Sequence, residues 1–445
     1  MSTREVIDEV PVDPATATVY AEGWQSWSPA AWFPVTATGP RPGEEWQHLM
    51  RFRPGTPVRD DGLQGEGLLV VDPGNGRPAR RYGTGDPGTV PTLHAELVGD
   101  HVLVRSDGPV GVTHHPDGGV AALTAYGDEL GGAPAPPPRV WCSWYRYFEE
   151  VSAADIDENL ESFARHELSV DVVQVDDGWS PGLGEGLGEA ARFGSLPALV
   201  DRIRGQGRRA GLWLAPFLVG AETTLAREHP DWLVGPAGRN WGQELVGLDL
   251  THPAVRELLT GHVQRLVGLG IDYLKLDFLY SGAVPGRRHE DADGVAAYRS
   301  GLRLVRDAVG PDVYLVGCGA PLLPSVGLLD AMRVSPDTFH EGGEDGSTGL
   351  RGLMPLAARG WQQGRLWVND PDCVVARPSY AQRERWCEAA RRLGGLRSFS
   401  DRVAELDEWG LRAVRDLLAD GGTAGPLATE DVQHGADLAL LEAGP

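Results

Sequence analysis

An alternation of short apolar and longer amphipathic segments after residue 139 constrains the fold of this chain more than any other feature. Eight apolar segments each have the length of one strand, and helical periodicity lies between most of them. This order predicts parallel strands covered by helices, and eight units predict one (β/α)8 TIM barrel. An open doubly wound sheet would alternate in the same way, usually with fewer units, but no Gly-x-Gly-x-x-Gly motif opens a helix here. The predicted strands are Val140–Trp144, Val170–Val175, Ala210–Ala215, Tyr273–Asp277, Val313–Gly317, Ala331–Ser335, Leu366–Asn369 and Arg397–Phe399.

A proline-rich segment at residues 133–139 (APAPPPR) divides the chain, because proline suits neither a helix interior nor a central strand. Before it, β-branched runs such as Gly67–Val71 and His101–Val104 alternate with turn residues, which predicts an antiparallel, sandwich-like β domain over residues 1–132. The barrel is predicted over residues 140–421, and residues 422–445 form a short tail with too weak a pattern to assign. Helical patterns lie at Ala153–Arg165, Ala254–Leu269, Gly294–Val309, Ala381–Leu393 and from Asp407 onward.

The composition is that of a globular protein with a strong negative charge. Hydrophobic residues make up 41% of the chain and charged residues 23%, and the formal net charge is −23. Phosphate backbones and anionic membranes would repel such a chain, so we expect neither nucleic acid nor a membrane as a partner. The start of the chain carries no secretory pattern, no apolar run is long enough to cross a bilayer, and the four cysteines form no C-x-x-C pair. We therefore expect a cytoplasmic protein with free thiols.

Polar and aromatic residues recur at the C-terminal ends of the predicted strands, where a barrel of this kind carries its active site. Paired carboxyl groups could serve as acid, base or nucleophile there, and tryptophans offer flat apolar faces on which a sugar ring can stack. The residues are Trp144, Asp176, Asp177, Trp213, Lys275, Asp277, Cys318, Arg333, Asp337, Asn369 and Asp370.

Glycoside hydrolysis needs one ionised and one protonated carboxyl group on opposite sides of the scissile bond. Asp277 suits the ionised nucleophile, because Lys275 lies on the same side of the strand and favours the charged carboxylate. Asp337 suits the acid/base role, because it follows Ser335-Pro336 just past a strand end. The adjacent pair Asp176-Asp177 could bind neighbouring sugar hydroxyls bidentately.

Lys275 is the only lysine in the chain, so 39 of the 40 cationic residues are arginine. An ammonium is a compact point donor, whereas a guanidinium is a wide planar fork. A narrow pocket beside a carboxylate could require the lysine. A surface position is disfavoured because the residue lies within the apolar stretch IDYLKLDF.

Each of these residues also has a structural interpretation when it is taken singly. An Asp-Asp pair after a strand is also found as a helix N-cap or in a metal site, and Asp277 alone could be a cap. A single tryptophan is more often a core residue than a sugar platform, and Cys318 alone is more often a small buried hydrophobe. Only their joint occurrence at successive strand ends indicates a catalytic site.

At these residues the sequence resembles the α-galactosidases of glycoside hydrolase family 36, and most of all their compact bacterial members. The matching stretches occur in the family's order and run from the N-terminal region to the end of the barrel. They are Gly23–Trp27 (GWQSW), Trp141–Phe148 (WCSWYRYF), Val173–Trp179 (VQVDDGW), Gly211–Phe217 (GLWLAPF), Tyr273–Gly286 (YLKLDFLYSGAVPG), Gly317–Gly327 (GCGAPLLPSVG), Met332–Thr338 (MRVSPDT) and Trp367–Cys373 (WVNDPDC).

The resemblance implies a retaining α-galactosidase with Asp277 as nucleophile and Asp337 as acid/base, acting on small galactosides or oligosaccharides without a metal or cofactor. Asp176 and Asp177 would read O4 and O6 of galactose, and Lys275 would donate to O3 and O4. The residues implied to line the galactose pocket are Trp27, Trp144, Asp176, Asp177, Trp213, Lys275, Cys318 and Arg333. Compared with the family pattern, the start of the N-terminal β-sandwich and most of the C-terminal β domain are missing, which leaves open whether the chain forms a homo-oligomer.

Other functions remain compatible with the same residues. Transfer of galactose to another sugar, as in raffinose-type synthesis, differs only in the acceptor, and cleavage of α-N-acetylgalactosaminides would need space near Cys318 and Arg333. A non-catalytic sugar-binding barrel is an alternative from another class. A metal-dependent barrel enzyme is a third, since Asp176, Asp277 and Asp337 could form a carboxylate site, although Lys275 beside them disfavours a cation.

Overall fold

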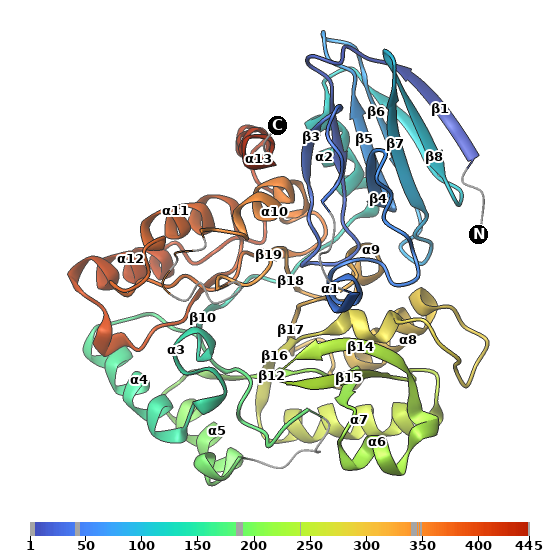
Figure 1. Ribbon diagram of the computed structural model, residues 1–445. Helices are drawn as coiled ribbons and strands as arrows, with labels where there is room; N and C mark the ends of the chain where they lie inside the picture. Colours follow the sequence, from blue (N-terminus) through green and yellow to red (C-terminus); the bar gives the residue numbers. More distant parts are fainter. Residues whose placement is uncertain are drawn as a thin grey trace.

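The computed structural model describes residues 5–40, 45–183, 190–240, 242–339, 345, 347 and 349–443. Eight parallel strands form one sheet, in which neighbours along the chain are neighbours in space from β10 to β19. The prediction of a (β/α)8 barrel is therefore confirmed (Figure 1). The strands are β10 (Arg139–Cys142), β11 (Val172–Val175), β12 (Arg209–Leu214), β16 (Ile271–Leu276), β17 (Tyr314–Gly317), β18 (Ala331–Arg333), β19 (Val368–Asp370) and β20 (Arg397–Phe399).

The barrel closes between its last two strands. β20 pairs with β10, which joins the end of the sheet to its beginning. On the other side of β20, the backbone N–H of Leu396 donates to the carbonyl of Asn369 at 3.0 Å, and an isolated bridge joins Val374 to Phe399. The register between β12 and β16 places Trp213 opposite Lys275. These two site candidates are therefore neighbours at the same end of the barrel.

Helices cover the outside of the barrel, and each predicted helical segment overlaps one of them. α4 begins at a capping box, in which the hydroxyl of Ser152 accepts from the backbone N–H of Asp155 while the Asp155 carboxylate accepts from the Ser152 N–H. Its apolar face, with Ile156 and Phe163, is buried against the barrel. The helices of this part are α3 (Trp144–Tyr147), α4 (Ala153–Arg165), α5 (Leu196–Gly205), α6 (Thr224–Glu228), α7 (Pro253–Gly268), α8 (Gly294–Val309), α9 (Leu322–Ser325), α10 (Leu353–Ala358), α11 (Arg383–Leu393) and α12 (Glu408–Ala419).

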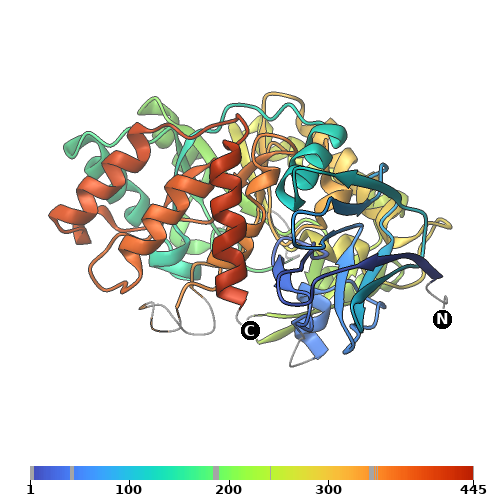
Figure 2. The same cartoon turned by 90° about the horizontal axis from the view of Figure 1, so that it is seen from above.

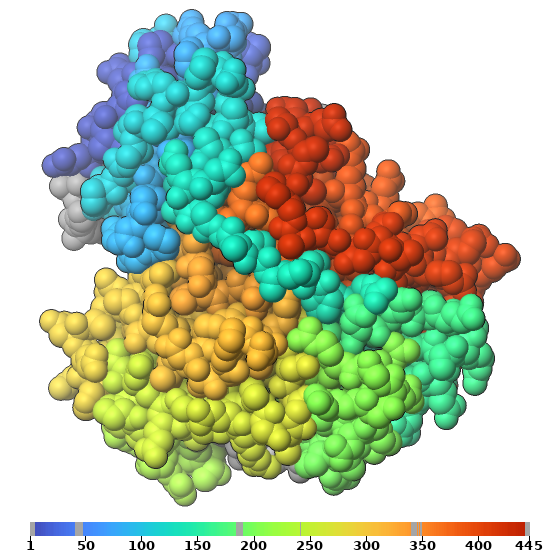
Figure 3. Space-filling model, turned by 180° about the vertical axis from the view of Figure 1, so that it is seen from behind, coloured from blue at the N-terminus to red at the C-terminus, as the bar shows by residue number. Residues whose placement is uncertain are grey.

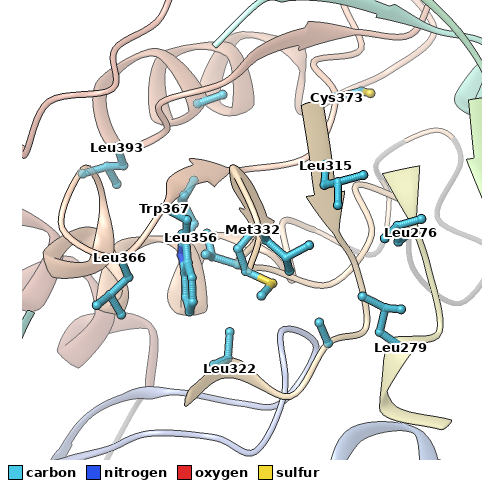
Figure 4. Close-up of a cluster of buried hydrophobic side chains, with 14 of the residues drawn as sticks. Leu276, Leu279, Leu315, Leu322, Met332, Leu356, Leu366, Trp367, Cys373 and Leu393 are labelled. Atoms are coloured by element: carbon cyan, nitrogen blue, oxygen red, sulfur yellow. The ribbon is translucent and has the colours of Figure 1, made fainter. Parts of the chain in front are cut away.

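The packing between barrel and helices is apolar. Figure 4 shows Leu276 and Leu315 on neighbouring strands, with Met332 and Trp367 beside Leu356 of α10. All five side chains are fully buried. Burial of such side chains supplies the main stabilising term of the fold.

The N-terminal part contains two antiparallel sheets, as predicted. One has the order β1-β8-β7-β4 and the other β3-β2-β5-β6-β9, and α2 packs on the second. The segment that leads from α2 to β10 crosses the surface above the barrel (Figure 3). The elements are β1 (Glu5–Pro11), β2 (Thr18–Ala21), β3 (Ala31–Pro34), α1 (Glu45–Arg51), β4 (Leu63–Glu66), β5 (Leu68–Asp72), β6 (Ala79–Gly83), β7 (Thr92–Val98), β8 (His101–Ser106), β9 (Gly111–His115) and α2 (Gly119–Leu130).

Three further features carry no clear sequence pattern. The helices α1 and α2 lie within the β-rich part, and a small sheet of β13 (Leu218–Gly220), β14 (Leu233–Asn240) and β15 (Gln243–Leu248) follows β12. The tail forms α13 (Thr429–Ala443), which packs against α10 and against β3 (Figures 1 and 2). α13 thus contacts both parts of the molecule. Among the described residues, no helix combines the length and the apolar character that crossing a bilayer requires.

Candidate active site

A cavity of about 270 Å³ lies at the C-terminal ends of the barrel strands. Its walls come from the barrel, from the N-terminal part and from the β14–β15 hairpin, and it collects four carboxyl groups and one ammonium. Six of the eight proposed pocket residues and both proposed catalytic residues line it, and the other two, Cys318 and Arg333, do not. The lining residues are Trp27, Met50, Arg51, Trp144, Asp176, Asp177, Trp213, Asn240, Lys275, Asp277, Phe278, Pro336, Asp337 and Phe339.

Lys275 makes its hydrogen bond to Asp176 and lies farther from Asp277. Its Nζ donates to Asp176 Oδ2 at 2.9 Å, while Asp277 Oδ2 lies 3.9 Å away. Asp176 Oδ2 also accepts from Gln174 Nε2 at 2.6 Å and from the Cys142 thiol at 3.4 Å. With its carboxylate surrounded by donors, Asp176 is placed to orient the lysine.

Asp277 is fixed at the end of β16 from two directions. The indole N–H of Trp213 donates to its Oδ2 at 3.1 Å, and the backbone N–H of Phe278 donates to its Oδ1 at 2.7 Å. Phe278 has a left-handed backbone, with φ of 51°, which turns its N–H toward the carboxylate. Burial raises the pKa of Asp277, the ammonium of Lys275 opposes this rise, and the charge of Asp337 adds to it.

Asp177 has a different environment from its neighbour Asp176. Its Oδ1 accepts from the backbone N–H of Gly178 at 2.7 Å. Burial raises the pKa of Asp177 to about 7, and the nearby charges of Asp176 and Asp277 contribute to the rise. A polar ligand that donates to this carboxylate would compensate its burial.

Asp337 reaches the cavity from the loop after β18 and is the most open of the four acids. Its side chain is 46% exposed, and its Oδ1 accepts from Arg333 Nη2 at 2.7 Å. Arg333 is itself 1% exposed and extends toward Cys318, with Nη1 3.8 Å from the sulfur. Arg333 therefore stands behind the wall of the cavity in contact with Asp337, and Cys318 lies beside Arg333, outside the lining.

Trp27 enters the cavity from the N-terminal part. Its ring meets that of Phe278 edge-on, with centroids 5.3 Å apart. Gly319 makes room for it: the glycine has φ of 53°, and a Cβ there would lie 2.9 Å from the indole. The loop that carries Trp27 is bound to the barrel, because the backbone N–H of Ser26 donates to the carbonyl of Ala320 at 3.1 Å.

Several residues of the cavity were not found from the sequence. Phe278 and Phe339 stand beside predicted acids and could have been noticed for that reason. Met50, Arg51 and Asn240 carry no such signal, since α1 and the β14–β15 hairpin bring them in from elsewhere. In the part of the chain that the structure describes, no group of three or more His, Cys, Asp or Glu side chains is arranged to hold a metal ion.

Carboxyl groups over a cavity at the C-terminal end of a barrel, with tryptophans at its walls, are the groups that a glycoside hydrolase needs. The family model described as Melibiase matches residues 141–305. The α-galactosidase of Thermus thermophilus, solved in complex with stachyose, is 31% identical, with a TM-score of 0.78 over 92% of this chain and 91% of that one. The chain therefore belongs to the α-galactosidases of glycoside hydrolase family 36.

Other matches are more distant or shorter. A family 36 α-galactosidase of Geobacillus stearothermophilus shares the fold, with a TM-score of 0.63 and 14% identity over 93% of this chain and 62% of that one. A bifunctional α-galactosidase/sucrose kinase of Mediterraneibacter gnavus is 31% identical over 142 residues, and α-galactosidase 1 of Pediococcus pentosaceus is 27% identical over 168. These matches cover 29% and 34% of this chain, but only 15% and 23% of the two curated proteins.

Proposed function

We propose that this chain is a retaining α-galactosidase that removes terminal α-linked galactose from small galactosides and oligosaccharides. One observation carries the proposal: a buried, doubly anchored carboxylate, Asp277, and a half-exposed one, Asp337, line the same cavity. The related Thermus thermophilus enzyme was solved with p-nitrophenyl α-D-galactopyranoside as well as with stachyose.

In the first step, Asp277 attacks the anomeric carbon while the bond to the leaving oxygen breaks. Asp337 gives its proton to that oxygen, so the leaving group departs as a neutral alcohol. In the second step, Asp337 takes a proton from water, whose oxygen attacks the anomeric carbon and displaces Asp277. Two inversions give net retention. The contacts from Trp213 and Phe278 hold Asp277 in place through both steps.

The remaining residues would bind the sugar. Lys275, oriented by Asp176, donates to hydroxyls, and Asp177 accepts from them, so the pair reads the configuration of the ring. Trp27, Trp144 and Trp213 supply apolar faces for the ring to stack on.

The proposal is tested with p-nitrophenyl α-galactoside beside the α-N-acetylgalactosaminide, the α-glucoside and the β-galactoside. Selective release from the α-galactoside, lost in Asp277→Ala, supports both the substrate class and the nucleophile. Asp272→Asn is the matched control, because Asp272 lies on the same strand at the opposite end of the barrel, 3.0 Å from Arg209. Full activity of Asp277→Ala, or release from another glycoside only, would contradict the proposal.

Stereochemistry is tested separately by proton NMR of the first product. An α-galactose signal that appears before mutarotation indicates retention, and an early β signal contradicts the double displacement. The same spectra, recorded with added raffinose-type acceptors, reveal whether water or another sugar accepts the galactosyl group.

A further inference from the structure

Asp372 lies behind Asp337, and no step of the proposed reaction uses it. It follows β19 after Pro371, is 4% exposed, and has φ of 81°, a conformation that residues other than glycine rarely adopt. Its backbone N–H donates to Asp370 Oδ1 at 2.9 Å. A buried side chain on such a backbone indicates that the surrounding contacts hold it there.

One oxygen of the Asp372 carboxylate, Oδ2, accepts three hydrogen bonds from Thr338 and Tyr145. Thr338 donates through its backbone N–H at 2.7 Å and its hydroxyl at 3.0 Å, and the Tyr145 hydroxyl donates as well. Arg333 Nη2 lies 3.0 Å from the same oxygen. Thr338 directly follows Asp337, and the same Nη2 of Arg333 donates to Asp337. Asp372 therefore holds Asp337 twice, through the next peptide group and through the guanidinium.

The buried guanidinium of Arg333 needs a counter-charge throughout the reaction, and Asp372 can supply it. Arg333 is buried and needs a counter-charge, because an unpaired buried charge is very unfavourable. Asp337 supplies one only while it is ionised, yet it must carry a proton when the leaving group departs. Asp372 is a second carboxylate beside the same nitrogen, so Arg333 remains paired when Asp337 is protonated.

The other described titratable groups around this pair either stay neutral near pH 7 or form no ion pair with Arg333. Burial raises the pKa values of Tyr145 and Cys318, which keeps both neutral near pH 7. Burial also raises the pKa of Asp370 to about 6, although the charge of Arg333 opposes this rise. Asp277, from β16, and Lys275 beside it face the cavity. Of the described acids, only Asp337 and Asp372 lie within ion-pair distance of Arg333.

We infer that Asp372 is a positioning residue for the acid/base step, which holds Arg333 so that Asp337 can keep its proton. The inference rests on the proposed function. Without this carboxylate, Arg333 would pair with Asp337 alone and favour its ionised form, so that proton donation would suffer more than attack by Asp277.

The test compares kcat/KM for two α-galactosides, one with a 2,4-dinitrophenyl and one with a phenyl leaving group. The first leaves without a proton, and the second needs the acid. We expect Asp372→Asn to lower kcat/KM for the phenyl glycoside about 100-fold and to change the dinitrophenyl value much less. The alkaline limb of the phenyl profile should also move to lower pH.

Asp330→Asn is the matched control. Asp330 precedes β18 at the opposite end of the barrel, where its Oδ2 accepts from Arg306 Nη2 at 2.5 Å and from the Leu315 N–H at 2.8 Å. This variant should leave the ratio of the two substrates unchanged. Tyr145→Phe removes one donor to Asp372 and should show the same selectivity to a smaller degree, so it decides the question if Asp372→Asn does not fold.

Equal losses on both substrates, in Asp372→Asn or in Tyr145→Phe, would overturn the inference and leave the proposed function intact. A wild-type protein that cleaves neither substrate would contradict the proposed function itself. The two failures are therefore distinguishable.

Discussion

Arg359 joins the two parts of the molecule through a fully buried guanidinium. Its Nε donates to Glu22 Oε1 at 2.9 Å, and both side chains are 0% exposed. Its Nη1 donates at 2.8 Å both to the carbonyl of Ser26, in the loop that carries Trp27, and to that of Val334, beside Arg333. Further bonds reach the carbonyls of Gln25 and Ser28. We predict that Arg359→Met strongly destabilises the protein.

The magnitude follows from what the methionine leaves behind. Glu22 keeps its hydrogen bonds from Tyr20 and Gln362 but loses Arg359, the cation that pairs with it inside the protein. Removing one partner of a buried ion pair costs about 3–5 kcal/mol of unfolding free energy. Four carbonyl groups lose a donor as well, which adds to that loss. Since domains are stable by about 5–15 kcal/mol, the variant should lose a large part of its stability.

Urea unfolding followed by circular dichroism measures the loss. The matched control is Arg202→Met, whose partner Asp157 is 45% exposed, and this variant should unfold near the wild-type midpoint. Because Arg359 also holds the Trp27 loop, KM should rise in Arg359→Met under conditions where the protein is still folded. An unfolding free energy of Arg359→Met within about 1 kcal/mol of wild type would refute the reasoning. The buried pair of Arg359 and Glu22 would then contribute no more to stability than an exposed ion pair does.

Three further predictions concern the cavity. Lys275→Arg should lower kcat/KM for an aryl galactoside about 100-fold in steady-state kinetics, because the wider guanidinium displaces Asp176 or the sugar. Near-normal activity would contradict the need for a compact donor at this position. Gly319→Ala should destabilise the protein by about 1 kcal/mol or more and shift the tryptophan fluorescence, whereas Gly261→Ala, on an open helix surface, should not. Asp177→Asn should lose sugar binding but become more stable than the wild type as the pH rises from 3.8 to about 7. In that range Asp177 of the wild type ionises in the unfolded state but keeps its proton in the folded state, so the folded wild type loses stability. The same difference in urea midpoint at pH 3.8 and at pH 7 would contradict the raised pKa of Asp177.

The sequence predicted the barrel strands well because their signal is local. Buried parallel strands appear in the sequence as continuous apolar runs, and each of the eight predicted runs overlaps the observed strand, with boundaries shifted by up to two residues. The helices α4 and α8 were predicted with their exact bounds for a similar reason, since each has a capping residue and a periodic apolar face. The β13–β15 sheet was missed because Pro236 and several glycines interrupt β14 and β15.

The tail shows why some elements escape prediction. α13 has only a weak amphipathic pattern, and its stability as a helix depends on the surfaces of α10 and β3 that it covers. Those surfaces are built by segments far away in the sequence. A helix that forms through tertiary packing leaves little trace in local periodicity.

By itself, the sequence determined that polar groups stand at the ends of the strands, because strand periodicity and barrel topology place them there. It did not determine which group binds which. Only the tertiary structure decided that Lys275 donates its hydrogen bond to Asp176 rather than to Asp277, and that Arg333 is shared by Asp337 and Asp372. The Lys275 ammonium lies 2.9 Å from Asp176 and 3.9 Å from Asp277, and Arg333 lies 2.7 Å from Asp337 and 3.0 Å from Asp372. Packing sets such distances, and the order of residues along the chain does not encode them locally.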